Sequence, residues 1–227
     1  MKKYLLLFVV VGLLPIQAVN AQKLGDVKLG LKLAPDITFM VPSTQGYSSK
    51  GVRMGGVLGL VTDIYFAEHY ALSTGFNMLL LGGKLSYADS IQGKVKGTTN
   101  SSLSFFYLEI PVMVKMFTKD FGKFSFFGQI GFGTGFRISA TAKNDYTANN
   151  GYTESGKSGI TYQTTTIREA LLIGLGAELH LDQATKLFFG LGYSNSLNNV
   201  LKGANNLSRL NQKAYLNYAE LNLGVMF

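Results

Sequence analysis

The chain has 227 residues, with 21 Lys and Arg against 13 Asp and Glu, a formal net charge of +8, and neither Cys nor Trp. Without Cys it can form neither a disulfide nor a thiolate metal site. Its basic residues are scattered rather than clustered, so the positive charge does not indicate a surface that binds nucleic acid.

Residues 1–21 have the three parts of a secretory signal peptide. A basic start (Lys2-Lys3) precedes an apolar run to Leu14, and Val19-Asn20-Ala21 resembles an A-x-A cleavage site. The apolar run is shorter than the ~20 residues that a transmembrane helix needs, so an uncleaved anchor is the weaker alternative. Cleavage leaves residues 22–227 as one mature domain of 206 residues, and its net charge is +6 because two lysines are removed.

Apolar and polar residues alternate with a period of two in eight segments of this domain, which indicates β-strands. Most of these segments exceed the ~9–11 residues that a tilted transmembrane strand needs, so we expect some strands to project beyond the lipid. The predicted strands are residues 27–39, 54–67, 70–85, 103–117, 123–140, 164–181, 186–198 and 214–227.

The connections between these strands alternate between short and long. The short ones are 67–69, 118–122 and 182–185, and the long ones are 40–53, 86–102, 141–163 and 199–213. An even number of strands with short turns at one end and long loops at the other is typical of outer-membrane barrels. We therefore predict an all-β fold, an eight-stranded antiparallel up-and-down transmembrane β-barrel in the bacterial outer membrane.

The size of the side chains favours an apolar outer face. A soluble, lipocalin-like barrel would have the same alternation with its apolar side chains inside. Eight strands enclose a bore that is only just wide enough for side chains to fill, and the large apolar residues of one face would overfill it. The opposite face is rich in glycine and carries the charges, as in Gly131, Gly133, Gly174, Gly176 and Glu178. Glycine makes room at a crowded axis, so we predict that this face lines the bore.

The last predicted strand alternates strictly over Ala219–Phe227 and ends in a phenylalanine. We expect it to close the barrel and to present Phe227 to the barrel-assembly machinery. Outer-membrane lipid is the second expected partner, because an apolar outer face requires it.

The charged residues assigned to the bore have both signs, and a charge buried without a partner is costly. We predict a structural network of ion pairs that plugs the bore, in which Arg137 or Lys186 neutralises Glu178 and Glu220. The residues of this predicted network are Lys28, Lys32, Asp63, Glu109, Lys115, Arg137, Glu178, Lys186 and Glu220.

Two other functions are weaker alternatives on the sequence. A small pore is disfavoured because eight strands leave little free bore. An outer-membrane lipid-modifying enzyme would need a nucleophile and a base, and Ser194 and His180 fall on neighbouring strands, but no nucleophile motif surrounds the serine. Two histidines without Cys make a poor metal site, so we expect no metal, no cofactor and no catalytic residues.

With the strands placed, Tyr107-Leu108-Glu109-Ile110-Pro111 and the following Lys115 resemble the "YLEIP-x-x-x-K" strand of the PorT-like outer-membrane β-barrel family of Bacteroidetes-type bacteria. Gly128–Gly133 and Leu221–Phe227 are similar to other parts of that family's pattern, although Gly192-Tyr193 lacks the Arg that members often have. The resemblance implies a barrel like those of OmpA and OmpX. One branch of the family supports protein secretion, but no motif carries that role residue by residue.

The sequence therefore predicts a monomeric, non-enzymatic scaffold that displays outer loops. Secretion-system or surface proteins are its possible partners.

Overall fold

The computed structural model describes residues 25–91, 95–182, 184–205 and 207–227. The predicted signal peptide lies outside the described residues. Within them, ten strands form a single sheet that closes on itself, and one short 3₁₀ turn lies between the seventh and eighth strands. These elements are β1 (Val27–Pro42), β2 (Tyr47–Ser49), β3 (Arg53–Ala67), β4 (Tyr70–Ile91), β5 (Val95–Phe117), β6 (Phe124–Ala148), β7 (Thr153–Gly159), η1 (Thr161–Gln163), β8 (Ile167–His180), β9 (Lys186–Ser196) and β10 (Ala214–Met226).

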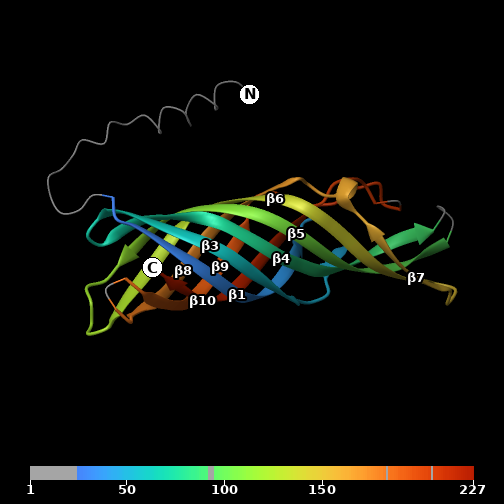
Figure 1. Cartoon of the computed structure of the whole chain (residues 1–227). Helices are drawn as coiled ribbons and strands as arrows, with labels where there is room; N and C mark the ends of the chain where they lie inside the picture. The colour runs from blue at the N-terminus through green and yellow to red at the C-terminus, as the bar shows by residue number, and fades with distance from the viewer. Residues whose placement is uncertain (1–24, 92–94, 183, 206) are drawn as a thin grey trace, which may run out of the picture.

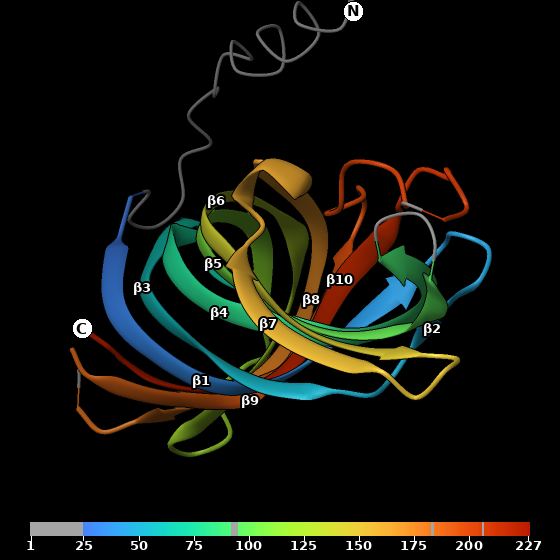
Figure 2. The same cartoon turned by 90° about the vertical axis from the view of Figure 1, so that its right-hand side faces the viewer.

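Eight of the strands form a closed barrel. They follow one another in the order β3-β1-β10-β9-β8-β6-β5-β4, and β4 pairs back with β3. Every neighbouring pair is antiparallel, and the first strand lies beside the last, with Gly30 opposite Met226. The view along the barrel in Figure 2 shows this ring. The predicted fold class is confirmed, because closure leaves no barrel strand with an unpaired edge in the lipid.

The two ends of the barrel differ. At the turn end, short connections join β3 to β4, β5 to β6 and β8 to β9. At the loop end, β4, β5 and β6 are 22, 23 and 25 residues long and run past the barrel, where β2 and β7 pair with their outer parts. We call β2, β7 and these outer parts of β4, β5 and β6 the projecting sheet; β7 marks it at the right of Figure 1.

The projecting sheet corrects two predicted loops. Residues 86–102 and 141–163 were expected to be irregular, but most of them are strand. Their sequence gives no apolar alternation, because the outward side chains there are polar and exposed, such as Lys96, Thr98 and Asn100. A strand with two polar faces carries no hydrophobic period to detect.

The outer face of the barrel is apolar over a band that matches a membrane. On β4 the outward side chains from Tyr70 to Leu80 are apolar except for Thr74, whose hydroxyl donates to the Pro111 carbonyl, and Phe76 is 60% exposed. Beyond this band Lys84 is exposed. Ten steps of ~3.3 Å, tilted by ~40°, cover about 25 Å along the barrel axis, which is the height of the apolar band in outer-membrane barrels. The predicted outward orientation of the apolar face therefore agrees with the exposure of these residues.

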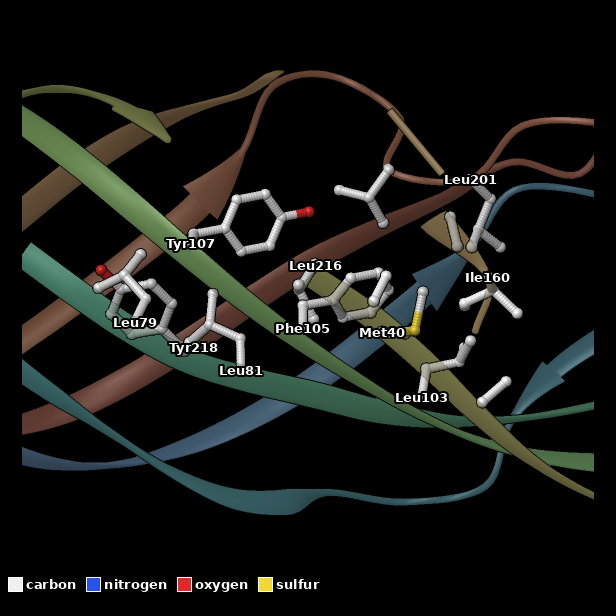
Figure 3. Close-up of a cluster of buried hydrophobic side chains, with 14 of the residues drawn as sticks. Met40, Leu79, Leu81, Leu103, Phe105, Tyr107, Ile160, Leu201, Leu216 and Tyr218 are labelled. Atoms are coloured by element: carbon white, nitrogen blue, oxygen red, sulfur yellow. The ribbon is translucent and has the colours of Figure 1, made fainter. Parts of the chain in front are cut away.

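The side chains that fill the bore are polar in one half and apolar in the other. This corrects the prediction of a polar interior throughout. Its turn-end half holds charged groups, whereas its loop-end half holds a cluster of large apolar side chains (Figure 3). Leu79 and Tyr107 are fully buried there, and Phe105 and Leu216 lie beside them. Apolar residues thus occupy both sides of the wall at the loop end.

A β-bulge explains why the faces of β6 were only partly predictable. Phe106 of β5 lies opposite Ser139, but Tyr107 lies opposite Arg137, so Ile138 is the extra residue on β6. A one-residue bulge sends every following side chain to the other face. Ala140 and Ala142 are therefore buried in the bore, although the alternation before the bulge would place them outside.

Gly75 is required by the backbone of β4. Its φ is +145°, and a Cβ at this position would lie 1.9 Å from the carbonyl oxygen of Leu60. The ladder between β4 and β5 is interrupted here, opposite Ile110 and Pro111, because proline has no N–H to donate.

We expect Gly75→Ala to lower the free energy of unfolding by ~1–3 kcal/mol, since the new Cβ must displace backbone of β3. Gly128→Ala is the matched control, because nothing lies within 4 Å of a Cβ there. Urea unfolding of both variants in lipid vesicles measures the difference. Equal stability of the two variants would contradict the strain assigned to Gly75.

Candidate functional site

A buried ionic cluster occupies the turn-end half of the bore. The Lys115 ammonium on β5 donates to Asp63 of β3 and to Glu178 of β8, each over 2.8 Å. Lys186 of β9 donates to the second oxygen of Glu178 over 3.1 Å. The Lys115 nitrogen also lies 4.4 Å from the centre of the Phe127 ring, a cation–π distance. Two lysines and two carboxylates therefore neutralise one another across four strands.

Small residues allow these ion pairs to form across an intervening strand. Lys115 on β5 and Asp63 on β3 are separated by β4, where Ala71 and Ser73 face the bore and are buried. A larger side chain at either position would fill the space through which Lys115 reaches. The pairing therefore depends on residues that carry no charge.

A second cluster lies nearer the middle of the barrel. The Arg168 guanidinium on β8 donates to Glu109 over 3.3 Å, to Ser194 over 2.8 Å and to the carbonyl of Leu216 over 2.9 Å. Asn77 donates to the other oxygen of Glu109 over 3.2 Å. Arg168 and Glu109 are completely buried, and a buried charge is costly unless it is paired and hydrogen-bonded. Here both the guanidinium and the carboxylate have such partners.

Gly133 makes room for this second cluster. A Cβ there would come within 2.8 Å of the Glu109 carboxyl carbon. Beside it, Lys32 of β1 pairs with Glu220 of β10 over 3.2 Å. The glycines of the inner face thus give space to carboxylates, in line with the size argument from the sequence.

Two residues of the predicted network are placed differently. Arg137 makes no ion pair in the described part of the chain. It instead donates to the carbonyls of Thr164 and Thr165 and to the Thr164 hydroxyl, in the irregular segment just before β8. Lys28 lies opposite Asp63 in the β1–β3 register, but among the described residues Asp63 is paired with Lys115. Neutralisation of Glu220 by Arg137 was therefore a wrong prediction.

Sequence reasoning missed two charged residues of the bore. Arg168 shares the inward parity of Ala170, Leu172 and Glu178, so the alternation alone was sufficient to place it there. Asp36, which is 3% exposed, follows Lys32 and Ala34 on the inner face of β1. Their partners could not be read from the sequence, because they depend on how the strands are staggered.

Two cavities found in the bore are small. A cavity of about 40 Å³ lies between Lys32, Asn77, Lys115 and Gln129, and another of about 50 Å³ lies near the loop end beside Leu85 and Ile160. A water molecule needs ~10–15 Å³ measured in this way, so each cavity can hold only a few waters. Ionic clusters and the apolar cluster fill most of the remaining bore.

His180 does not meet Ser194, which binds Arg168 instead. Its Nε2 lies 3.1 Å from the hydroxyl oxygen of Ser125, and its Nδ1 lies 3.9 Å from a carboxylate oxygen of Asp120. These residues border an open cavity of about 480 Å³ at the turn end, which Lys119 and His69 also line. The 3.9 Å separation exceeds hydrogen-bond length, so the carboxylate does not orient the imidazole directly.

No helix among the described residues is long and apolar enough to cross a membrane. No group of three or more His, Cys, Asp or Glu side chains in that part of the chain has metal-binding geometry.

The family comparison agrees with the fold. The profile of the family described as "Outer membrane protein beta-barrel domain" matches residues 20–202, and the chain belongs to this family. The protein is therefore an outer-membrane β-barrel protein of bacteria. The comparison with curated proteins finds no significant match.

Solved structures with the same fold are outer-membrane barrels. AlkL, solved in lipid bilayers, is 12% identical with a TM-score of 0.50, and the match covers 94% of each chain. OprG from Pseudomonas aeruginosa is 12% identical with a TM-score of 0.47, over 92% of this chain and 99% of its own. Neisserial surface protein A is 11% identical with a TM-score of 0.42, over 88% and 95%. At such identities the likeness shows the fold alone.

We expect Lys115→Met to lower the free energy of unfolding by ~3–5 kcal/mol, because it leaves Asp63 and Glu178 buried with too little positive charge. Lys119→Met, in the exposed turn, should change it by less than ~0.5 kcal/mol. Denaturant titration in lipid vesicles measures both.

A combined variant separates charge from packing. Asp63→Asn and Glu178→Gln, added to Lys115→Met, remove the uncompensated carboxylates and should restore part of the lost stability. If Lys115→Met is as stable as Lys119→Met, the cluster does not hold the bore together.

Proposed function

We propose that this protein is a closed, non-enzymatic scaffold of the outer membrane that displays the projecting sheet for binding at the cell surface. The observation that carries the proposal is the contrast between the two parts of the molecule. The bore is filled by ion pairs at the turn end and by apolar side chains at the loop end. Three strands nevertheless continue past the membrane band and build a polar sheet that closure of the barrel does not need.

The orientation follows from barrel architecture. Outer-membrane barrels have their short turns in the periplasm and their long connections outside. On this basis the turn end is periplasmic, the projecting sheet is extracellular, and residues 1–21 act as the signal peptide that directs export. Loops and sheets on a rigid scaffold commonly carry binding function.

The proposed partners during assembly are lipid and the barrel-assembly machinery. The backbone of Phe227 exchanges two hydrogen bonds with Leu29, and the residue is 51% exposed. Before closure this last strand presents an unpaired edge and a free aromatic ring, which are the features that an assembly factor could bind.

In its more specific form, the proposal is that the scaffold assists protein secretion. It rests on the resemblance of Tyr107–Lys115 to the PorT-like barrels. Crosslinking in intact host cells followed by purification tests it, since a secretion accessory should recover envelope proteins of the secretion apparatus. Recovery of the barrel alone would count against it.

The filled bore gives a direct expectation for ion flux. In planar lipid bilayers the purified protein should give no steady ionic current at applied voltages at which an open porin conducts. A steady current that rises with the number of inserted molecules would instead support the small pore as the function.

A hydrolase at the periplasmic mouth is the second candidate function, favoured by the contact between Ser125 and His180. The scaffold proposal expects no labelling of the folded protein by a fluorophosphonate probe, which reacts with activated serines. Labelling that disappears in Ser125→Ala but persists in Ser73→Ala would support the enzyme and contradict the scaffold.

A further inference from the structure

One row of side chains crosses the whole projecting sheet. Tyr47 of β2 lies opposite Tyr87 of β4, Tyr87 opposite Thr99 of β5, Thr99 opposite Tyr146 of β6, and Tyr146 opposite Glu154 of β7. Five strands at ~4.8 Å spacing make a strip about 20 Å long. We call it the tyrosine strip.

The rings of the tyrosine strip are held in place. The rings of Tyr47 and Tyr87 are stacked, with centroids 4.6 Å apart and planes at 16°, and Asn205 donates to the Tyr47 hydroxyl over 3.0 Å. The Tyr146 ring lies over Gly97, where a Cβ would come within 2.7 Å of it. Rigid rings lose little conformational entropy when a ligand binds.

Polar groups border the strip on the side of β7. A cavity of about 240 Å³ is lined by Asp89, Thr99, Asn144, Tyr146, Glu154, Gly156, Lys157 and Ser158. Asn144 also borders the neighbouring cavity beside Tyr87. Its side-chain oxygen is buried and has no hydrogen-bond partner among the described residues. A buried acceptor without a donor is costly, and a ligand can supply the missing donor.

We propose that the tyrosine strip and this cavity bind an oligosaccharide chain with neutral or amino sugars. The assignment rests on the proposed surface-binding function and names its ligand class.

The mixture of groups fits sugar hydroxyls. Each hydroxyl both donates and accepts, and the site offers carboxylate acceptors in Asp89 and Glu154, together with an amide in Asn144 that can do both. Burial raises the pKa of the Tyr87 phenol above its usual range, so the phenol stays protonated and can donate. Tyr47 and Tyr87 are half-buried, so their stacked rings offer an apolar surface to the C–H face of a sugar ring, whereas Tyr146 is buried and borders the cavity.

Charge and shape argue against other ligands. Asp89 and Glu154 outnumber Lys157, whose register partner Lys143 belongs to the opposite face, so the cavity carries a net negative charge, which disfavours sulfated or phosphorylated chains. A peptide that extends a sheet binds along an unpaired strand edge, whereas the strip lies on the face of the sheet. Few large apolar side chains line the cavity, so it does not fit an acyl chain.

Titration calorimetry on the folded protein in detergent micelles tests the proposal. The probes are chitohexaose, maltoheptaose, a heparin hexasaccharide and the oligosaccharide released from the host's own outer-membrane glycolipid. We expect at least one neutral or amino oligosaccharide to bind, and the heparin fragment to bind at least tenfold more weakly. Binding of the released glycolipid chain alone would identify the host membrane as the source.

Variants on the two faces of β6 and β7 supply the controls. Asn144→Ala and Glu154→Ala should each weaken binding about tenfold, the effect of one lost hydrogen bond to a polar ligand. Lys143→Ala, on the opposite face of β6, should leave binding unchanged. Retained gel mobility of the unheated barrel shows that each variant is folded.

The proposal is wrong if no probe binds at millimolar concentration, if heparin binds best, or if Asn144→Ala binds as well as Lys143→Ala. The outcome is separable from that of the scaffold itself. A surface protein crosslinked to the projecting sheet, with no oligosaccharide bound, would keep the scaffold and overturn the oligosaccharide assignment. A steady current through the bore would overturn the scaffold whatever the sheet binds.

Discussion

Hydrocarbon offers no hydrogen-bond partner to a peptide group, and the rest of this structure depends on that constraint. Every N–H and C=O within the membrane band must pair with another strand, so the sheet has to close, with β1 beside β10 and β4 beside both β3 and β5. Closure with eight strands then fixes a narrow bore. Side chains, not solvent, must fill it.

The bore is filled by two kinds of packing, and each kind suits its place. In the turn-end half, charged side chains neutralise one another around Lys115 and Glu178, and glycines and other small residues give them space. In the loop-end half, leucines and aromatic rings pack as in the core of a soluble protein. This apolar core supports the strands where they leave the lipid. The projecting sheet therefore stands on a rigid base.

Much of the barrel could be predicted from the sequence, because lipid imposes a strict period of two. Leu29, Leu31 and Leu33 of β1 are all about half exposed, as the alternation of an outward apolar face requires. The projecting strands could not be recognised, since side chains such as Lys143 and Thr147 meet water and need no alternation. The bulge at Ile138 has no signature in the sequence and reverses the faces of β6 beyond it.

The sequence predicts that the charged residues of the bore pair with opposite charges, but it does not predict which residues pair. Opposite charges within one narrow bore had to pair, and Lys186 does meet Glu178. Which carboxylate meets Lys115 depends on strand stagger and on the small residues of β4 between them. Arg137 binds carbonyls because the irregular segment just before β8 supplies acceptors closer than any carboxylate. Local backbone geometry therefore determines which partner each charged residue binds, and composition does not.

Apolar side chains lie on both sides of the barrel wall, with one set in lipid and the other in the bore. The chain has no tryptophan, so a single Trp can report on one position at a time. Phe76 faces outward and is 60% exposed, whereas Phe105 is buried in the bore. In vesicles of lipids with brominated acyl chains, the fluorescence of Phe76→Trp should be strongly quenched and that of Phe105→Trp should not. Equal quenching at both positions, or quenching of Phe105→Trp alone, would contradict the account.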